Sequence, residues 1–330
     1  ADRLVLVVEI GAAVLELKSS LQESPEHGES RLFLGMLYSA TGDYRSAEKE
    51  FRRAIDAGID PGRVLPTLGK VLVLQGESRR VLDELSPEAS REPEATAGIL
   101  APRGMAHTAL RQPSEAEAAF AKALLLDPDH FDARLGRARL IAGERNIEGA
   151  LEEVEKALKA APSAADAHML KGDLLRAVGR VDEARTAYRA VVASQPGHVN
   201  ALLALVSLEV SAGKLDEASG QLAAVRKAAP GHAMAAYFQA LIDFRKGDFK
   251  AARDAIGSVL KVAPGHLPSV LIGGAVEFAL GSQELAQTRL KHVLDRMPAN
   301  AYARRLLIAS YARAGQTHKA MELLEPMLKQ

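Results

Sequence analysis

Prolines recur along this chain at intervals of 34 residues, and small residues keep the same interval. The prolines are Pro128, Pro162, Pro196, Pro230, Pro264 and Pro298. The alanines are Ala116, Ala150, Ala184, Ala218, Ala252, Ala286 and Ala320. A period of this length is typical of a helix–turn–helix unit that buries its apolar face only by stacking on its neighbours. The spacing therefore predicts a row of stacked helix pairs.

The period divides the whole chain into units. We expect a partial unit at 1–27, full units at 28–61, 62–96, 97–130, 131–164, 165–198, 199–232, 233–266 and 267–300, and a truncated unit at 301–330. Apolar residues recur with helical periodicity, and no stretch alternates convincingly as a strand does. We therefore expect an all-α fold: one α-solenoid, coiled as a right-handed superhelix, with two helices in each unit.

Small residues also predict how the two helices of a unit meet. Helix axes in a hairpin approach to about 8–10 Å, which leaves room only for small side chains at the contact. We expect Ala184 of the second helix to face Gly172 of the first, and Tyr188 to fill the space between neighbouring units. Glycine followed by aspartate, as at Gly42–Asp43, is expected to end the first helix and start the next one.

The unit at 62–96 breaks the pattern. Val81 replaces the alanine, and Pro87 and Pro93 interrupt the second helix, because proline cannot donate its backbone N–H. We expect a short second helix, a loop through Ser86–Pro93, and a seam between two sub-arrays at this unit.

Composition excludes several classes of function. Of the 330 residues, 42 are basic and 42 are acidic, so the chain lacks the positive charge of a nucleic-acid-binding protein. No basic run indicates a membrane surface, and the apolar run Leu4–Val8 is too short to span a bilayer. The chain has no cysteine, which excludes disulfides and thiolate metal sites.

A series of histidines follows the prolines, at His27, His130, His198, His232 and His266. A ladder of metal sites is one interpretation. However, stacked helices lie about 10 Å apart, whereas metal–ligand bonds are about 2 Å long. We therefore interpret these histidines as turn residues that lead into the first helix of a unit. Neither metal nor cofactor is expected, and no catalytic motif predicts an enzyme.

The small-residue ladder resembles that of the tetratricopeptide repeat (TPR) superfamily. Several segments resemble more specifically the TPR-repeat lipoproteins of bacterial PEP-CTERM/exosortase systems. These segments are Val14–Pro25, Gly42–Pro66, Val81–Leu85, Lys261–Leu280 and Tyr302–Leu328. The resemblance implies a periplasmic or outer-membrane-associated protein with a lipidated N-terminal cysteine, linked to exopolysaccharide or surface-protein export. This chain lacks that cysteine, and we expect it to be a piece of a longer protein.

The resemblance also implies candidate binding residues. In the superfamily, positions 2, 5, 9 and 12 of each first helix line a concave groove. The apolar candidates at these positions are Met234, Tyr237, Leu241, Phe244, Leu271, Phe278 and Tyr302. The charged candidates are Arg139, Asp166, Asp173, Arg176 and Arg305. They would hold a peptide or a partner helix, with the aromatic side chains as hot spots; alternatively, they contact adjacent helices.

These expectations favour a non-catalytic scaffold that binds a protein partner in its groove. A spacer that self-associates is the alternative from a different class, and a cytosolic TPR adaptor is a further one. We expect a monomer or a weak homo-oligomer. A membrane partner is expected only through a lipid anchor outside this chain, and the partner's identity is not encoded.

Overall fold

A computed structural model describes the backbone of residues 2–328 and the side chains of residues 10–325. Within this part the chain forms 19 α-helices and one short 3-10 helix, with no strand. None of the described helices is both long and apolar enough to cross a membrane. The predicted all-α fold is therefore confirmed. Contacts divide the chain into two compact units, Ala1–Ala190 and Val191–Gln330, which we describe separately.

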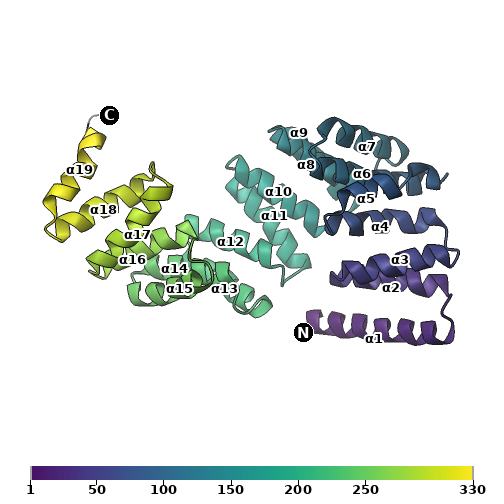
Figure 1. Cartoon of the computed structure of the whole chain (residues 1–330), viewed down its shortest axis with the longest axis horizontal. Coiled ribbons are helices and arrows are strands. Elements are labelled where there is room, and N and C mark those ends of the chain that lie inside the picture. Colours follow the sequence, from purple (N-terminus) through teal and green to yellow (C-terminus); the bar gives the residue numbers. More distant parts are fainter. Residues whose placement is uncertain (1, 329–330) are drawn as a thin grey trace. The chain divides into compact units, whose positions relative to one another are not determined.

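The first unit begins with one unpaired helix and continues with helix pairs (Figure 1). Its elements are α1 (Asp2–Glu23), α2 (Gly28–Thr41), α3 (Tyr44–Asp56), α4 (Pro61–Leu74), α5 (Ser78–Glu84), η1 (Pro87–Ala89), α6 (Pro93–Ala109), α7 (Pro113–Leu126), α8 (Phe131–Gly143), α9 (Ile147–Ala160) and α10 (Ala165–Ala177). The boundary of the two units falls within α11 (Val181–Ser194).

The second unit continues the pairing of helices. Its elements are α12 (Val199–Ser211), α13 (Leu215–Ala228), α14 (Ala233–Lys246), α15 (Phe249–Val262), α16 (Leu267–Ala279), α17 (Gln283–Arg296), α18 (Ala301–Arg313) and α19 (Thr317–Leu328). Each first helix is 13 or 14 residues long and is followed closely by its partner. That one solenoid runs through both units stays a prediction.

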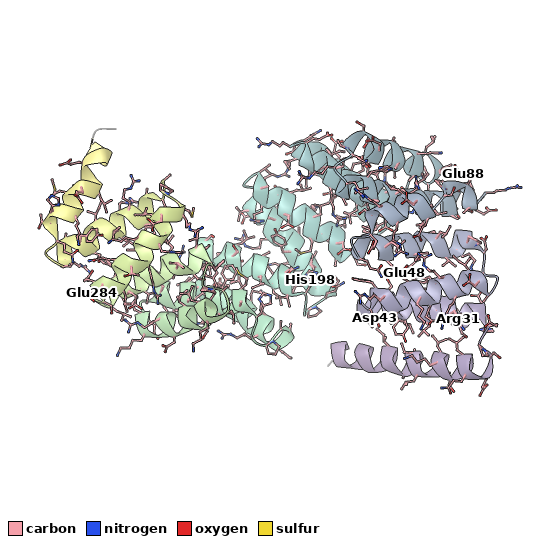
Figure 2. The ribbon with its side chains drawn as sticks, viewed as in Figure 1. Arg31, Asp43, Glu48, Glu88, His198 and Glu284 are labelled. Carbon is pink, nitrogen blue, oxygen red and sulfur yellow. The ribbon has the colours of Figure 1, made fainter. Side chains whose placement is uncertain are left out.

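Local sequence explains where these helices begin and end. Gly42 adopts a left-handed conformation with φ of 82°, which glycine reaches without steric cost. Asp43 then caps α3 by accepting a hydrogen bond from the amide of Ser46 at 3.2 Å (Figure 2). Gly247 and Asp248 repeat the arrangement between α14 and α15. The predicted role of the glycine–aspartate turns is confirmed.

The contact between paired helices differs in detail from the prediction. All the alanines of the ladder are buried, as expected. However, the atoms nearest to Gly172 belong to the ring of Tyr188, the larger residue one helical turn after Ala184. Gly104 and Phe120 show the same arrangement. The glycine of the first helix therefore makes room for a large side chain of the second helix.

The irregular unit at 62–96 has the short second helix that its prolines predict. Helix α5 spans only 7 residues, and Pro87 starts η1 beyond it. Helices α4 and α6 contact each other directly here. The predicted seam is wrong in position, because the two compact units divide after residue 190 and not at this unit.

Candidate functional site

Histidines cap the first helices. Nδ1 of His27, His130 and His198 each accepts the amide hydrogen of the residue three positions later, at 3.2 Å (Figure 2 labels His198). His266 Nδ1 lies 2.7 Å from the hydroxyl of Ser269, whereas His232 makes no side-chain cap. These contacts confirm the interpretation of the three capping histidines as turn residues. No cluster of metal-ligating side chains occurs among the described residues.

The apolar candidates on α14 lie between core and solvent. Met234, Tyr237 and Leu241 pack against the hydrophobic core of the second unit and remain partly exposed. The ring of Tyr237 stands edge-on to that of His266, with 5.4 Å between centroids. Phe244 lies 5.6 Å from the ring of Phe249 on α15. These residues thus contact neighbouring helices and still present apolar surface.

The apolar candidates on α16 and α18 continue this surface. Leu271 and Phe278 pack on the core around α17 and α18. The guanidinium of Arg313 covers the Phe278 ring at 4.2 Å, which is a cation–π contact. Tyr302 is 40% exposed, and Arg305 beside it is exposed too. Burial of the ring raises the pKa of Tyr302 above its ordinary value, and the charge of Arg305 opposes this shift.

Two of the charged candidates are joined to one tyrosine within the first unit. Tyr188 donates a hydrogen bond of 2.7 Å to Asp173, and Arg176 donates one of 3.4 Å to the Tyr188 hydroxyl. Burial, and then the hydrogen bond to Asp173, raise the pKa of Tyr188 to about 12. Asp173 and Arg176 therefore hold α10 and α11 together. Arg139 and Asp166 are exposed.

Ion pairs between repeats were not foreseen from the sequence. Arg63 donates two hydrogen bonds to Glu29, at 2.5 and 3.0 Å, and so joins α4 to α2. Lys70 on α4 pairs with Asp132 on α8 at 2.5 Å. Three of these residues occupy position 2 of their first helix and Lys70 occupies position 9, so these four groove positions of the first unit are satisfied by one another.

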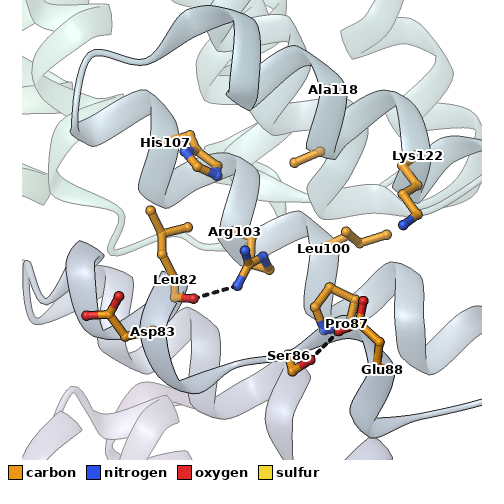
Figure 3. Close-up of a pocket in the computed structure, with 11 residues that line it drawn as sticks. Leu82, Asp83, Ser86, Pro87, Glu88, Leu100, Arg103, His107, Ala118 and Lys122 are labelled. Carbon is orange, nitrogen blue, oxygen red and sulfur yellow. Dashed lines mark hydrogen bonds between the residues drawn. The ribbon is translucent and has the colours of Figure 1, made fainter.

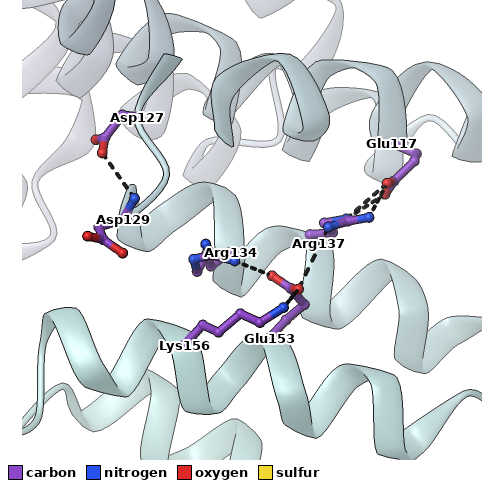
Figure 4. A network of polar contacts seen from close by, with 7 residues as sticks. All are labelled: Glu117, Asp127, Asp129, Arg134, Arg137, Glu153 and Lys156. Carbon is purple, nitrogen blue, oxygen red and sulfur yellow. Dashed lines mark hydrogen bonds and ion pairs between the residues drawn. The ribbon is translucent and has the colours of Figure 1, made fainter. Parts of the chain in front are cut away.

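A buried carboxylate joins α8 and α9 (Figure 4). Glu153 accepts hydrogen bonds of 2.8 Å from both Arg134 and Lys156, and its side chain is 6% exposed. Arg137 lies 3.7 Å away and also pairs with Glu117. Burial alone would raise the pKa of Glu153, but the hydrogen bonds from Lys156 and Arg134 hold it below its usual value. The cluster is structural, because its charges are engaged with one another.

The same pair occurs earlier in the chain. Arg31 donates a 2.9 Å hydrogen bond to Glu50, and the two are as far apart in sequence as Arg134 and Glu153. Figure 2 labels Arg31. An arginine and a glutamate 19 residues apart, at fixed repeat positions, were a sequence signal that could have revealed both clusters. In the second unit Glu277 meets Arg253 and Arg289 instead.

Stacked helix pairs with small-residue contacts and surface apolar side chains define an α-solenoid of helix hairpins. Protein-family models described as tetratricopeptide repeat match residues 28–57, 102–154, 142–199 and 175–242. Together these matches cover just over half of the chain, and it belongs to the tetratricopeptide repeat superfamily. Proteins of this superfamily are typically non-catalytic scaffolds for protein interaction.

Solved structures agree on the fold. PilF of Pseudomonas aeruginosa is 17% identical with a TM-score of 0.57, over 63% of this chain and 95% of PilF. PilW, a type IV pilus biogenesis factor, is 20% identical with a TM-score of 0.55, over 64% of this chain and 98% of PilW. A thermophilic TPR protein of Thermus thermophilus is 20% identical with a TM-score of 0.50, over 55% of this chain and 98% of its own. No curated protein matches the chain significantly.

Proposed function

We propose that the second unit binds a peptide or partner helix across the first helices α14, α16 and α18. The observation that carries this proposal is that the apolar side chains at positions 2, 5 and 12 of α14 and α16, and at position 2 of α18, remain at least partly exposed. Met234 and Tyr237 keep part of their side chains accessible although they pack on the core, and Tyr302 is 40% exposed. Aromatic side chains with one face anchored and one face free are frequent hot spots in interfaces.

Charge distinguishes this surface from its counterpart in the first unit. Position 2 holds Met234, Pro268 and Tyr302 in the last three repeats, and none of the three is charged. In the first unit the corresponding residues Glu29 and Arg63 are occupied by their mutual ion pair. An apolar partner that covers α14, α16 and α18 would therefore remove water from fewer charged side chains than one that covers α2 and α4.

A cross-linking and capture experiment tests the proposal. A photo-reactive residue placed at Ala309 on α18 would be expected to capture a partner from bacterial envelope extract. Tyr302→Ala, an exposed change that leaves the core intact, is expected to reduce capture at least tenfold. Leu285→Ala on the second helix α17, 53% exposed, is the matched control and should capture normally. Equal capture by both variants would contradict the proposal.

We further propose that the scaffold works in the bacterial envelope during exopolysaccharide or surface-protein export, with a lipoprotein anchor encoded outside this chain. The sequence segments that resemble PEP-CTERM/exosortase TPR lipoproteins support this. Fractionation of the source cells, with an antibody against this chain, tests it. Recovery in the cytosolic fraction alone would favour the cytosolic adaptor instead.

Self-association is the second candidate, and one observation favours it. Large apolar side chains are exposed on second helices, with Val262 72% and Leu285 53% exposed. Sedimentation equilibrium over a hundredfold range of protein concentration tests it. A monomer throughout that range would remove this candidate.

A further inference from the structure

The first helices of the second unit keep their acidic residues at a single repeat position. Helices α12, α14, α16 and α18 together contain three, Glu209, Asp243 and Glu277, and each is 34 residues from the next. This is position 11 of the first helix. Positions 2, 5, 9 and 12, which form the proposed binding surface, hold no acidic residue in any of these four helices.

The carboxylates at position 11 are buried or hydrogen-bonded within the protein. Glu277 is 2% exposed, and its two arginine partners come from the second helices α15 and α17. Glu209 is likewise 2% exposed. Asp243 accepts a hydrogen bond of 2.6 Å from Gln239, which in turn accepts one of 2.9 Å from Arg226 on the second helix α13. These acidic residues therefore do not charge the proposed surface.

Arginines of the same first helices do lie at that surface. Arg305 is exposed at position 5 of α18. Arg313, at position 13, covers the ring of Phe278 at position 12 of α16, with 4.2 Å to the ring centroid. Arg245, at position 13 of α14, donates a hydrogen bond to the carbonyl oxygen of Val210 at position 12 of α12. Position 13 thus places a guanidinium against the surface twice.

These three guanidinium groups have no counter-charge. All three side chains are exposed, and none of them forms an ion pair among residues 10–325. Lys246 differs, because it pairs with Asp216 on α13 at 2.8 Å. The proposed surface therefore carries positive charge only, which attracts an anionic partner and repels a cationic one.

The first unit lacks this bias, as its open cavity illustrates (Figure 3). The cavity of about 500 Å³ exists because α5 ends after 7 residues, whereas α7 and α9 each run for 14. Arg103 in it donates hydrogen bonds to the carbonyl oxygens of Leu82 and Leu85, and Lys122 and Glu88 also line it. Acidic and basic side chains share this cavity, so it selects neither sign of charge.

The apolar part of the proposed surface selects among anionic partners. Tyr237, Leu271 and Phe278 are partly exposed on α14 and α16. Apolar side chains can cover these groups, while carboxylates fit the planar guanidinium through two parallel hydrogen bonds. A protein segment offers both kinds of side chain, whereas an acidic polysaccharide offers charge without aliphatic groups. Zero net charge over the whole chain argues against a nucleic acid.

We propose that the partner segment is acidic and amphipathic. It places Asp or Glu side chains against Arg305 and Arg313, and its apolar side chains on Tyr237, Leu271 and Phe278. This inference rests on the proposed function, because it concerns the partner of that same surface.

Selection of random phage-displayed dodecapeptides on the whole immobilised chain tests the charge preference without assuming a sequence. Selected peptides are expected to carry more Asp and Glu than Lys and Arg, beside aromatic or aliphatic residues. A chain with both Arg305→Gln and Arg313→Gln should lose this excess. The matched control removes two exposed charges from second helices, by Lys261→Gln on α15 and Arg296→Gln on α17, and should keep it.

One selected peptide, synthesised with acetylated and amidated ends, then gives affinities by fluorescence anisotropy. Blocked ends leave only side-chain carboxylates to meet the arginines. Arg305→Gln and Arg313→Gln are each expected to weaken binding about fivefold or more, since each removes a charge-assisted hydrogen bond. Replacing Asp and Glu of the peptide by Asn and Gln should weaken binding to the unmodified chain, but not to the double variant.

Failure of this inference is distinguishable from failure of the proposed surface. No selected peptide at all, or peptides that bind Tyr302→Ala as tightly as the unmodified chain, would overturn both. Peptides that lose affinity for Tyr302→Ala but are neutral or basic would overturn the acidic partner alone. Displacement of the selected peptide by polygalacturonate, an acidic polymer without apolar side chains, would also overturn it, in favour of a polysaccharide.

Discussion

The ring of Phe120 fills the space that Gly104 leaves free: a Cβ atom added at Gly104 would stand 2.5 Å from the ring. Gly136, on the following first helix, approaches the same ring: a Cβ atom added there would also stand 2.5 Å from it. Phe120 on α7 is therefore clamped between α6 and α8. One side chain joins two consecutive repeats, because both helices present a glycine to it.

Gly104→Ala is expected to destabilise the chain. Overpacking in a dense core costs about 1–3 kcal/mol, which outweighs the gain of up to about 1 kcal/mol in helix propensity. Urea unfolding followed by circular dichroism measures the change. The control is Gly220→Ala on α13, where nothing lies within 4 Å of the added atom, and there we expect a gain of about 0.5–1 kcal/mol. The same sign for both variants would contradict the clamp.

Gly98→Ala and Pro66→Ala are expected to be coupled. A Cβ atom at Gly98 would lie 2.9 Å from the Pro66 ring, and in turn the ring of Pro102 lies against Gly69. Each of the two helices, α4 and α6, thus packs a proline ring against a glycine of the other helix. Gly98→Ala alone should destabilise, and Pro66→Ala in the same chain should remove part of that loss, because it removes the Cγ atom of Pro66 but keeps the Cβ atom, and both lie 2.9 Å from the added atom. A double-mutant cycle measures the coupling, and additive effects would show that the two residues act separately.

Glu153→Gln is expected to cost on the order of 3 kcal/mol in the free energy of unfolding, since it leaves Arg134 largely buried without its counter-charge. Glu152→Gln, one position earlier and exposed, is the matched control and should change stability by less than about 0.5 kcal/mol. Chemical unfolding compares the two. A combined Arg134→Met and Glu153→Gln variant should regain part of the loss; no recovery would mean that burial of the arginine charge is not the cause.

Acid is expected to weaken the start of α8 through His130. Burial lowers the pKa of His130 below its ordinary 6.5, although Asp132 and Asp127 oppose the shift and Lys70 adds to it. As the pH falls through 6.5 the unfolded chain takes up the proton first, so stability is present above that pH and decreases below it. Protonation of Nδ1 also removes the N-cap, which is usually worth about 1 kcal/mol.

His130→Asn isolates this effect, because Asn300 caps α18 by the equivalent bond at 2.9 Å and does not titrate. We expect the variant to lose less stability than the unmodified chain between about pH 7.5 and about pH 5.5, as measured by urea unfolding. All other histidines are the same in both proteins. An identical loss in both would show that His130 is not responsible.

Periodicity alone revealed the helix pairs, because a 34-residue repeat leaves the buried face of every unit at the same positions. The turns at Gly42–Asp43 and the capping histidines followed for a similar reason, since capping chemistry is local and depends on a few adjacent residues. Pro87 likewise predicted that the second helix of its unit, α5, would be short. These features need no knowledge of which units are neighbours in space.

Only the tertiary structure decided which side chains meet. The glycine of α6 makes room for the ring of Phe120, one turn after the alanine of the ladder, because the direction of the side chain along the helix brings that residue over the glycine. Asp173 and Arg176 met Tyr188, and the cavity beside Arg103 opened where α5 stops short. Such contacts depend on the packing of helices from different repeats, which spacing along one chain does not specify.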